Sequence, residues 1–113
     1  MRSLASQPRR VQEALLELKR RIAERFPECL VDLRLYGSRA RDHAGADSDA
    51  DVLVVLEQAG WEERRQVIDL AADIGLEHDL IVSPTVFDRA TYDRWRDQRR
   101  PLVLEIERDG IPL

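Results

Sequence analysis

The chain has 113 residues, the size of one compact domain, so residues 1–113 are expected to form a single domain. Its net charge of −4 has the wrong sign for a protein that binds nucleic-acid backbone over a broad surface, and no direct nucleic-acid binding is expected. Cys29 is the only cysteine, which excludes an intrachain disulfide and a cysteine-rich zinc site. No apolar stretch approaches the roughly 20 residues that span a bilayer, and no apolar signal segment stands at the start, so a cytoplasmic protein without membrane attachment is expected.

The first predicted element is a helix that begins at Pro8, with Ser6 as its N-cap, and stops at Pro27. Its apolar residues recur at spacings of three and four, which is the period of a helix with one buried face: Val11, Leu15, Leu18, Ile22 and Phe26. Residues 31–36 then alternate between apolar and polar types, which predicts a strand with one covered face.

The middle of the chain predicts a strand, a helix and a second strand. Residues 50–56 form a short β-branched apolar run without alternation, as expected of a central strand that is covered on both faces. Residues 61–76 show helical spacing, and Trp61 is expected to pack at the start of this helix. A further strand is expected over residues 79–82, with Pro84 ending it.

The remaining segment, residues 85–108, predicts one broken helix or two short helices around Pro101, with a C-cap at Gly110. Its apolar residues exceed what one small sheet face needs, so they are expected to bind a helical partner protein; the alternative is that they cover the sheet. These residues are Tyr92, Trp95, Leu102 and Leu104. The order of elements predicts an α/β (α+β) domain with a small mixed sheet of about three to four strands and helices packed on it.

Carboxylates gather at the entry to the strand predicted over residues 50–56. Asp49 and Asp51 are two residues apart, so their side chains leave the strand on the same face. If the next strand lies beside this one, Asp79 at its start reaches the same place. Like charges that close repel each other unless a cation lies between them, and carboxylate oxygens suit magnesium. The pattern therefore predicts a magnesium site at Asp49, Asp51 and Asp79, with Glu77 as the alternative third carboxylate.

The acidic segment has three other interpretations. It matches the first three ligand positions of a calcium-binding loop with Asp47, Asp49 and Asp51, but Val52 and Gln58 stand where that loop requires glycine and glutamate. The aspartyl nucleophile of a phosphatase follows an apolar strand, whereas these aspartates precede one. A solvated acidic turn is the usual role of an Asp-rich loop, so the carboxylates alone do not decide the function.

A Gly-Ser pair upstream favours the functional interpretation. Gly37 allows a tight turn after the strand over residues 31–36, and Ser38 is expected to begin a short helical segment whose exposed N–H groups form an anion site. Phosphate bound at this turn and a metal bound at the carboxylates together define a nucleoside triphosphate site. Arg39 and Arg41 are candidates for contact with phosphate, the alternative being that they are solvated loop residues.

Ten residues separate Gly37-Ser38 from Asp49-Ala50-Asp51, and this spacing resembles that of the DNA polymerase β-like nucleotidyltransferases. The small size, the stretch LYGSRARDHAGADSDADVLVVL and the later EHDLIVS make the chain look most like the minimal nucleotidyltransferase (MNT) branch. The resemblance covers nearly all of the chain, most strongly residues 33–56. It implies the polymerase β-like palm fold and a nucleotidyltransferase activity.

The resemblance also implies a role for each matching residue. The triphosphate of ATP would be bound by Gly37 and Ser38, with Arg39 as a further candidate, and two magnesium ions would be held by Asp49, Asp51 and Asp79. Asp79 would help to activate the attacking hydroxyl. In such phosphoryl-group transfer, metal ions neutralise charge on the α-phosphate and the leaving pyrophosphate.

MNT-like proteins often act beside a helical HEPN-type ribonuclease in toxin–antitoxin pairs, in which the MNT member transfers AMP from ATP to a tyrosine of its partner. The resemblance thus implies an antitoxin that adenylylates a HEPN-type toxin. The chain is expected to form an oligomer, either with that toxin or with further copies of itself. One alternative is a non-catalytic binding module that neutralises a partner by contact. Another is nucleotidyl transfer to a small molecule such as an aminoglycoside, although 113 residues leave little room for an acceptor pocket.

Overall fold

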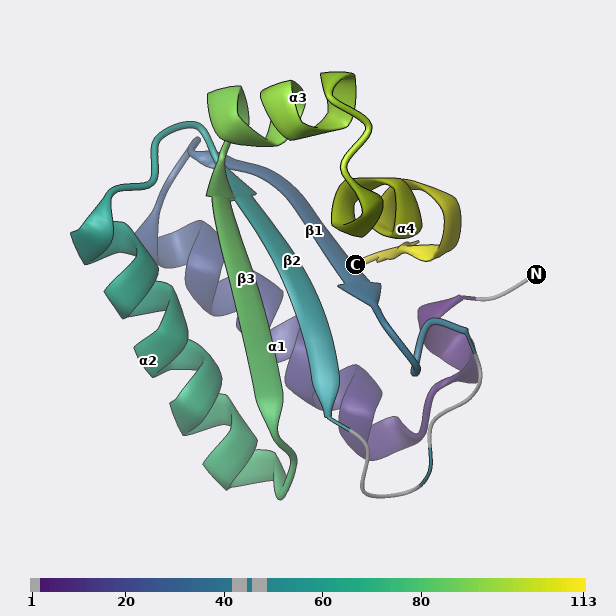
Figure 1. The fold of residues 1–113 in the computed structure, drawn as a ribbon. Coiled ribbons are helices and arrows are strands. Elements are labelled where there is room, and N and C mark those ends of the chain that lie inside the picture. The colour runs from purple at the N-terminus through teal and green to yellow at the C-terminus, as the bar shows by residue number, and fades with distance from the viewer. Residues whose placement is uncertain (1–2, 42–44, 46–48) are drawn as a thin grey trace.

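A computed structural model of the protein describes residues 3–41, 45 and 49–113. It shows a sheet between two layers of helices (Figure 1). The elements in chain order are a 3₁₀ turn Leu4–Ser6, α1 Arg9–Arg25, β1 Leu30–Tyr36, β2 Ala50–Leu56, α2 Trp61–His78, β3 Val82–Asp88, α3 Arg89–Asp97, α4 Pro101–Asp109 and β4 Ile111–Pro112. None of the helices in these residues is long and apolar enough to cross a bilayer.

The sheet is mixed, with the strand order β3-β2-β1-β4. β1 is antiparallel to β2 and to β4, whereas β2 and β3 are parallel. A parallel pair requires a crossover connection, and α2 provides it. The side chains from Val52 to Leu56 of the central strand β2 are all buried. The predicted mixed sheet and the doubly covered central strand are therefore confirmed.

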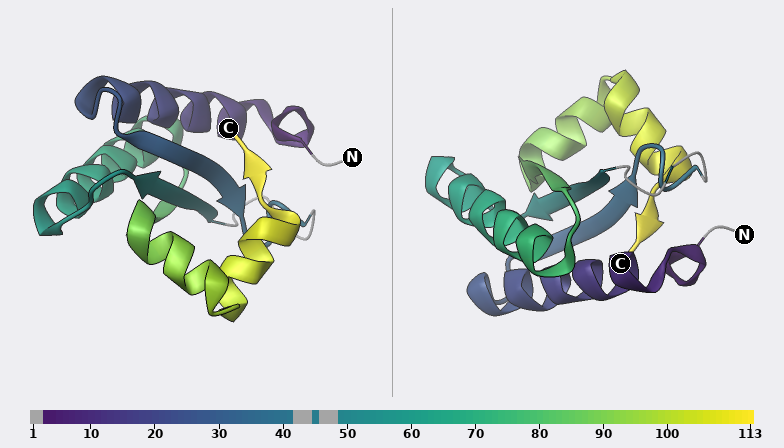
Figure 2. Two further views of the ribbon diagram at one scale, coloured as in Figure 1. Left: turned by 90° about the horizontal axis from the view of Figure 1, so that it is seen from above. Right: turned by 90° about the horizontal axis from the view of Figure 1, so that it is seen from below.

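Helices cover both faces of the sheet, as Figures 1 and 2 show. α1 and α2 pack on one face, where Val52 and Val54 meet the buried side chains of α1. α3 and α4 cover the other face, toward which Leu53 and Val55 point. Alternate residues of β2 thus enter two separate cores, because successive side chains of a strand leave on opposite faces. The unbroken apolar run of β2 serves both cores.

The aromatic residues of α3 belong to the second core. The ring of Phe87 packs edge-on against Tyr92 and Trp95, with centroids 5.6 and 5.0 Å apart. Tyr92 is 4% exposed, and Trp95 and Leu102 pack against the same cluster. Leu104 is half-buried. The structure therefore supports the alternative, that Tyr92, Trp95 and Leu102 cover the second face of the sheet, and binding of a partner through these helices stays a prediction.

The third strand differs most from its prediction. β3 runs from Val82 to Asp88 instead of over residues 79–82, and Pro84 lies inside it. Since β3 is an edge strand, the N–H that proline lacks is not required by a neighbouring strand. The helices predicted over residues 85–108 accordingly begin only at Arg89. Two short helices separated before Pro101, the second capped by Gly110, are confirmed.

Two predictions at helix starts are also wrong. Pro8, not Ser6, is the N-cap of α1, because Ser6 closes the preceding 3₁₀ turn. Trp61 does not pack at the start of α2, since its side chain is 76% exposed. The short strand β4 was not predicted, because two residues cannot show a period.

The buried hydroxyl of Tyr92 predicts a loss of stability at high pH. It donates to Glu107 Oε1 at 3.1 Å, and burial together with the Glu107 charge raises the Tyr92 pKa to about 12. Above pH 10 the unfolded chain loses this proton while the native state keeps it, so stability falls as the pH rises. Between pH 10 and 12, urea denaturation should show wild type losing about 2 kcal/mol more than Tyr92→Phe. Parallel pH profiles of the two proteins would contradict this expectation.

Candidate functional site

The predicted Gly-Ser turn and the two aspartates lie together at one end of the sheet. β1 ends at Tyr36, immediately before Gly37, and β2 begins at Ala50. Because these strands are antiparallel, the end of β1 lies beside the start of β2, and Tyr36 pairs directly with Asp51. Residues distant in the sequence are thereby joined in one site, as the Gly-Ser and Asp-x-Asp spacing predicts.

The carboxylates lie on the face of the sheet that α3 and α4 cover. Ala50 is buried in the first core, so strand alternation places Asp51 on the opposite face with Leu53 and Val55. Asp49 is exposed and Asp51 is half-buried. Burial, followed by the charges of Asp49 and then of Glu105, raises the Asp51 pKa above its usual range. The structure therefore brings the predicted pair together.

Gly37 lies directly beside Asp51. Its φ is +75°, a left-handed backbone conformation that favours glycine. A Cβ added at this residue would lie 2.4 Å from Asp51 Oδ2, so only glycine lets the turn approach the carboxylate this closely. After it, Arg41 N–H donates to the carbonyl oxygens of Gly37 and Ser38 at 3.3 and 3.2 Å. A hydrogen-bonded turn stands where a short helical segment was predicted at Ser38.

Glu105 of α4 is a third carboxylate beside this site, and the sequence analysis missed it. Its charge raises the pKa values of Asp51 and of Tyr36. Its side chain forms an ion pair with Arg41 of the Gly37 turn. Nothing in the helical pattern of α4 distinguishes Glu105 from a surface glutamate, so only the packing of α4 against the sheet reveals it.

Arg39 is 3% exposed, which is unusual for a loop arginine. Its carbonyl oxygen accepts a hydrogen bond from Gln7 Nε2 at 2.9 Å. Burial and the nearby charge of Arg10 lower the Arg39 pKa, while the charge of Asp49 opposes that shift. Arg39 is therefore not a solvated loop residue, and it brings positive charge close to Asp49. Its role as a nucleotide ligand stays a prediction.

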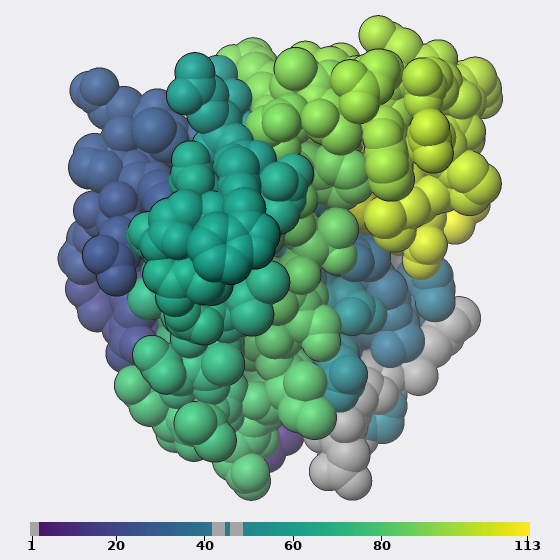
Figure 3. Space-filling view, turned by 60° about the vertical axis from the view of Figure 1, so that its left-hand side comes forward, coloured from purple at the N-terminus to yellow at the C-terminus, as the bar shows by residue number. Residues whose placement is uncertain are grey.

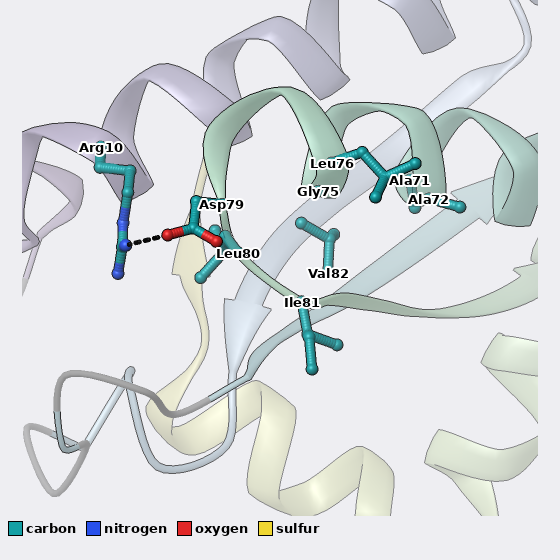
Figure 4. A pocket seen from close by; sticks show the side chains of 9 residues that line it. All are labelled: Arg10, Ala71, Ala72, Gly75, Leu76, Asp79, Leu80, Ile81 and Val82. Carbon is teal, nitrogen blue, oxygen red and sulfur yellow. Dashed lines mark ion pairs between the residues drawn. The ribbon is translucent and has the colours of Figure 1, made fainter.

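The structure does not bring Asp79 to the aspartate pair. Asp79 is the left-handed C-cap of α2, with φ 53°, rather than the first residue of a strand. The residue of β3 that pairs with Asp51 is Ser83, four positions later. The side chain of Asp79 is fully exposed and turns toward Arg10, with Asp79 Oδ2 lying 3.8 Å from Arg10 Nη1 (Figure 4).

The alternative carboxylate, Glu77, lies on α2 and pairs with Arg21 Nη2 of α1 at 2.8 Å. Within residues 3–41, 45 and 49–113, no three histidine, cysteine or acidic side chains gather to form a metal site. Asp47, the first position of the alternative calcium loop, lies outside the described residues. A protein cage of three carboxylates is thus not present in the described part of the chain.

An open pocket of about 660 Å³ lies elsewhere, between the end of α2, the start of β3 and Arg10 of α1 (Figure 4). Its lining includes Asp79 but none of the residues of the Gly37 turn or the aspartate pair. The turn predicted to bind phosphate and the paired carboxylates lie outside this pocket.

The donor set of the aspartate pair fits a divalent cation that also binds substrate phosphates. Magnesium in such sites takes one or two protein carboxylates and completes its coordination with phosphate oxygens and water. Asp49 and Asp51 could supply these carboxylates, and the Gly37 turn lies directly against Asp51. The arrangement is suited to hold a metal–phosphate complex.

The family model of the nucleotidyltransferase domain matches residues 15–100. The chain is 28% identical over 95 residues to a protein of Methanocaldococcus jannaschii named "Putative protein adenylyltransferase", a match that covers 83% of this chain and 96% of the relative.

Two solved structures share the fold. The first is a chain from the crystal structure of "the toxin-antitoxin with AMP-PNP", with a TM-score of 0.54 and 17% identity over 85% of this chain and 69% of that one. The second is "a putative nucleotidyltransferase from Sulfolobus solfataricus", with a TM-score of 0.51 and 18% identity over 95% of this chain and 88% of that one. The family match spans most of the chain, and the two structures have the fold expected of it. This chain therefore belongs to the nucleotidyltransferase domain family and is a nucleotidyltransferase.

Proposed function

We propose that this enzyme transfers AMP from ATP, in a magnesium-dependent reaction, to a tyrosine hydroxyl of a HEPN-type toxin, and so acts as an antitoxin. The observation that carries the proposal is the contact between the Gly37 turn and the Asp51 carboxylate, which places a phosphate-binding turn against a metal ligand. The MNT resemblance, the adenylyltransferase name of the archaeal relative and the toxin–antitoxin structural neighbour support the choice of donor and partner.

The chain's own residues bind and orient the nucleotide. The backbone N–H groups of the Gly37–Ser38 turn would donate hydrogen bonds to the triphosphate oxygens, and Asp49 and Asp51 would hold the two magnesium ions. When bound at these carboxylates, magnesium would supply the positive charge that neutralises the α-phosphate and the leaving pyrophosphate. Arg39, buried close to Asp49, supplies fixed positive charge at the edge of the site.

The reaction exchanges one phosphorus–oxygen bond for another. The acceptor hydroxyl oxygen attacks the α-phosphorus in line with the leaving group, and the bond from that phosphorus to the bridging oxygen of pyrophosphate breaks. The hydroxyl proton passes to a carboxylate of the site. Since a single domain of this size has little room for a second pocket, the partner protein supplies the acceptor tyrosine.

The test is to incubate the enzyme with labelled ATP, magnesium and a candidate HEPN-type partner, and to measure the partner by mass spectrometry. The proposal expects one or more AMP groups on a partner tyrosine and a loss of the partner's toxicity. Loss of toxicity without any AMP transfer would instead identify the binding module. Transfer to an aminoglycoside, with the partner unmodified, would identify the small-molecule enzyme.

Magnesium and a non-hydrolysable ATP analogue should together stabilise the fold more than either does alone. The cation relieves the repulsion between Asp49 and Asp51, and ligand that binds only the native state adds stability by mass action. At about a hundred times the dissociation constant the gain is about 2.7 kcal/mol, which differential scanning fluorimetry detects as a higher melting temperature. The control is the Asp49→Asn/Asp51→Asn double variant, which should show no such joint effect; an unchanged wild-type melting temperature would contradict the site.

The proposed role of Asp79 as the third carboxylate is tested by Asp79→Asn. If it helps to remove the hydroxyl proton, transfer should fall by about a hundredfold while nucleotide binding, measured by calorimetry, is retained. Because the side chain is fully exposed, folding should not change. Wild-type activity in Asp79→Asn would show that another group removes the hydroxyl proton. Glu105→Gln is then the variant to test, since Glu105 is the carboxylate close to Asp51.

A further inference from the structure

The outer side of α2 carries apolar side chains that no other described element covers. We call this surface the α2 stripe, and it consists of Trp61, Ile68, Ala72 and Leu76 of α2 together with Ile81 after it. Trp61 is 76%, Ile68 51%, Leu76 84% and Ile81 63% exposed. The opposite side of α2 supplies Val67, Ala71 and Ile74 to the first core. Figure 3 shows the outer side of α2, in teal and green, at the surface.

The two ends of the α2 stripe have complementary shapes. At the N-terminal end, Trp61 projects with the guanidinium of Arg65 6.0 Å from its ring. At the C-terminal end lies the open pocket of about 660 Å³, whose lining includes Ala72, Leu76 and Ile81 (Figure 4). One end therefore offers a large aromatic ring, and the other offers an apolar hollow that is large enough for it.

Charged side chains lie at both ends of the α2 stripe. Beside Trp61 lies the guanidinium of Arg65, which is held by Glu62 and Asp69 of the same helix. At the pocket, Asp79 is fully exposed and lies 3.8 Å from Arg10. Arg10 itself lines the pocket, and a guanidinium stabilises an aromatic ring placed over it. The ring of an incoming Trp61 would thus meet a cation in the pocket.

We propose that the α2 stripe is the interface of a twofold-symmetric dimer of this chain. The two α2 helices pack antiparallel, and Trp61 of each subunit enters the pocket of its partner. In an antiparallel pair the N-terminal end of one helix lies beside the C-terminal end of the other, so both tryptophans reach a pocket at once. Ile68, midway between the two ends, lies at the twofold axis. A surface that carries both the projecting group and its pocket is self-complementary, which is the requirement for such an interface.

The aspartate pair is not part of the interface. The α2 stripe belongs to the α1–α2 layer, whereas Asp51 faces the α3–α4 layer. Asp79 lines the pocket, and its part in the reaction is tested separately by Asp79→Asn.

Sedimentation velocity tests the proposal. The wild-type sedimentation coefficient should give a mass twice the 13.1 kDa of one chain, and the dimer should dissociate on dilution. Trp61→Ala and Leu76→Glu should sediment as monomers at the concentration where wild type is a dimer. Leu16→Glu, at a half-exposed leucine of α1 outside the stripe, is the matched control and should remain dimeric. A wild-type chain that stays monomeric overturns the proposal and leaves the stripe to a different protein, and a dimer that survives both stripe substitutions overturns it equally.

A crosslinking experiment tests the antiparallel arrangement. In a Cys29→Ser background, Ile68→Cys places two thiols at the proposed axis, and a short bis-maleimide should join the subunits. Leu16→Cys, treated in the same way, should stay uncrosslinked. A dimer that cannot be joined through residue 68 would overturn the twofold geometry. Circular dichroism of each variant confirms that the fold is retained.

Discussion

Replacement of Asp49 and Asp51 by asparagine is expected to lower AMP transfer by about a thousandfold or more. The amide keeps the shape of the side chain but removes the charge that holds the divalent cation against the phosphates. Each single variant and the double variant should be compared with wild type by the labelling of the candidate partner. The effect should fall on the rate of transfer, because the bound cation acts on the charge that develops during the reaction.

The fold should survive these substitutions. The raised pKa of Asp51 shows that its charged form is disfavoured in the native state, so loss of that charge should leave stability at neutral pH equal or higher. This advantage should disappear at acidic pH, where Asp51 of wild type is protonated in both states. The control for activity is Asp93→Asn, the same change at a residue of α3 whose side chain is 44% exposed. Labelling that persists in the double variant would refute the metal assignment.

Gly37→Ala should also lower the transfer rate strongly. Its loss of folding stability should be too small to explain that loss of activity. The left-handed backbone at Gly37, φ +75°, makes alanine unfavourable by about 1–2 kcal/mol. The new methyl group would lie 2.4 Å from Asp51 Oδ2, and this carboxylate can avoid it only by turning away. Misplacement of a metal ligand by about 1 Å lowers the rate by about a hundredfold.

Gly60→Ala is the matched control for Gly37→Ala. Gly60 is the N-cap of α2, with φ −89°, and an added Cβ would meet nothing closer than a Glu63 carboxylate oxygen at 3.6 Å. Its stability should fall by about 1 kcal/mol or less, because alanine is a poorer N-cap than glycine, and its activity should remain that of wild type. Equal activity of the two variants at matched fractions folded would show that the Gly37 contact does not position Asp51.

Patterns within one element were readable from the sequence. The spacing of apolar residues identified the buried side of α1, and the unbroken run of β2 identified a strand between two layers. The shared face of Asp49 and Asp51 follows from strand geometry alone, and the glycine at residue 37 predicted a tight turn. Each of these inferences depends only on residues close together in the chain.

The third strand shows where this local information ends. Its start depends on how far α2 continues and on its pairing with β2, and neither is recorded in residues 79–88 themselves. Pro84 suggested a strand end, but proline is tolerated here because the strand lies at the sheet edge. The displacement of the strand start from residue 79 to Val82 leaves Asp79 beside Arg10 instead of beside Asp51.

The sequence by itself therefore determined α1, α2, the central strand β2, the mixed character of the sheet and the pairing of the Gly37 turn with two carboxylates. Only the tertiary structure decided that Glu105 comes close to Asp51, that Arg39 is buried and that Trp61 is exposed. The physical reason is that a side chain's direction follows from the period of its own helix or strand, whereas its neighbours and its burial depend on which distant elements pack against it.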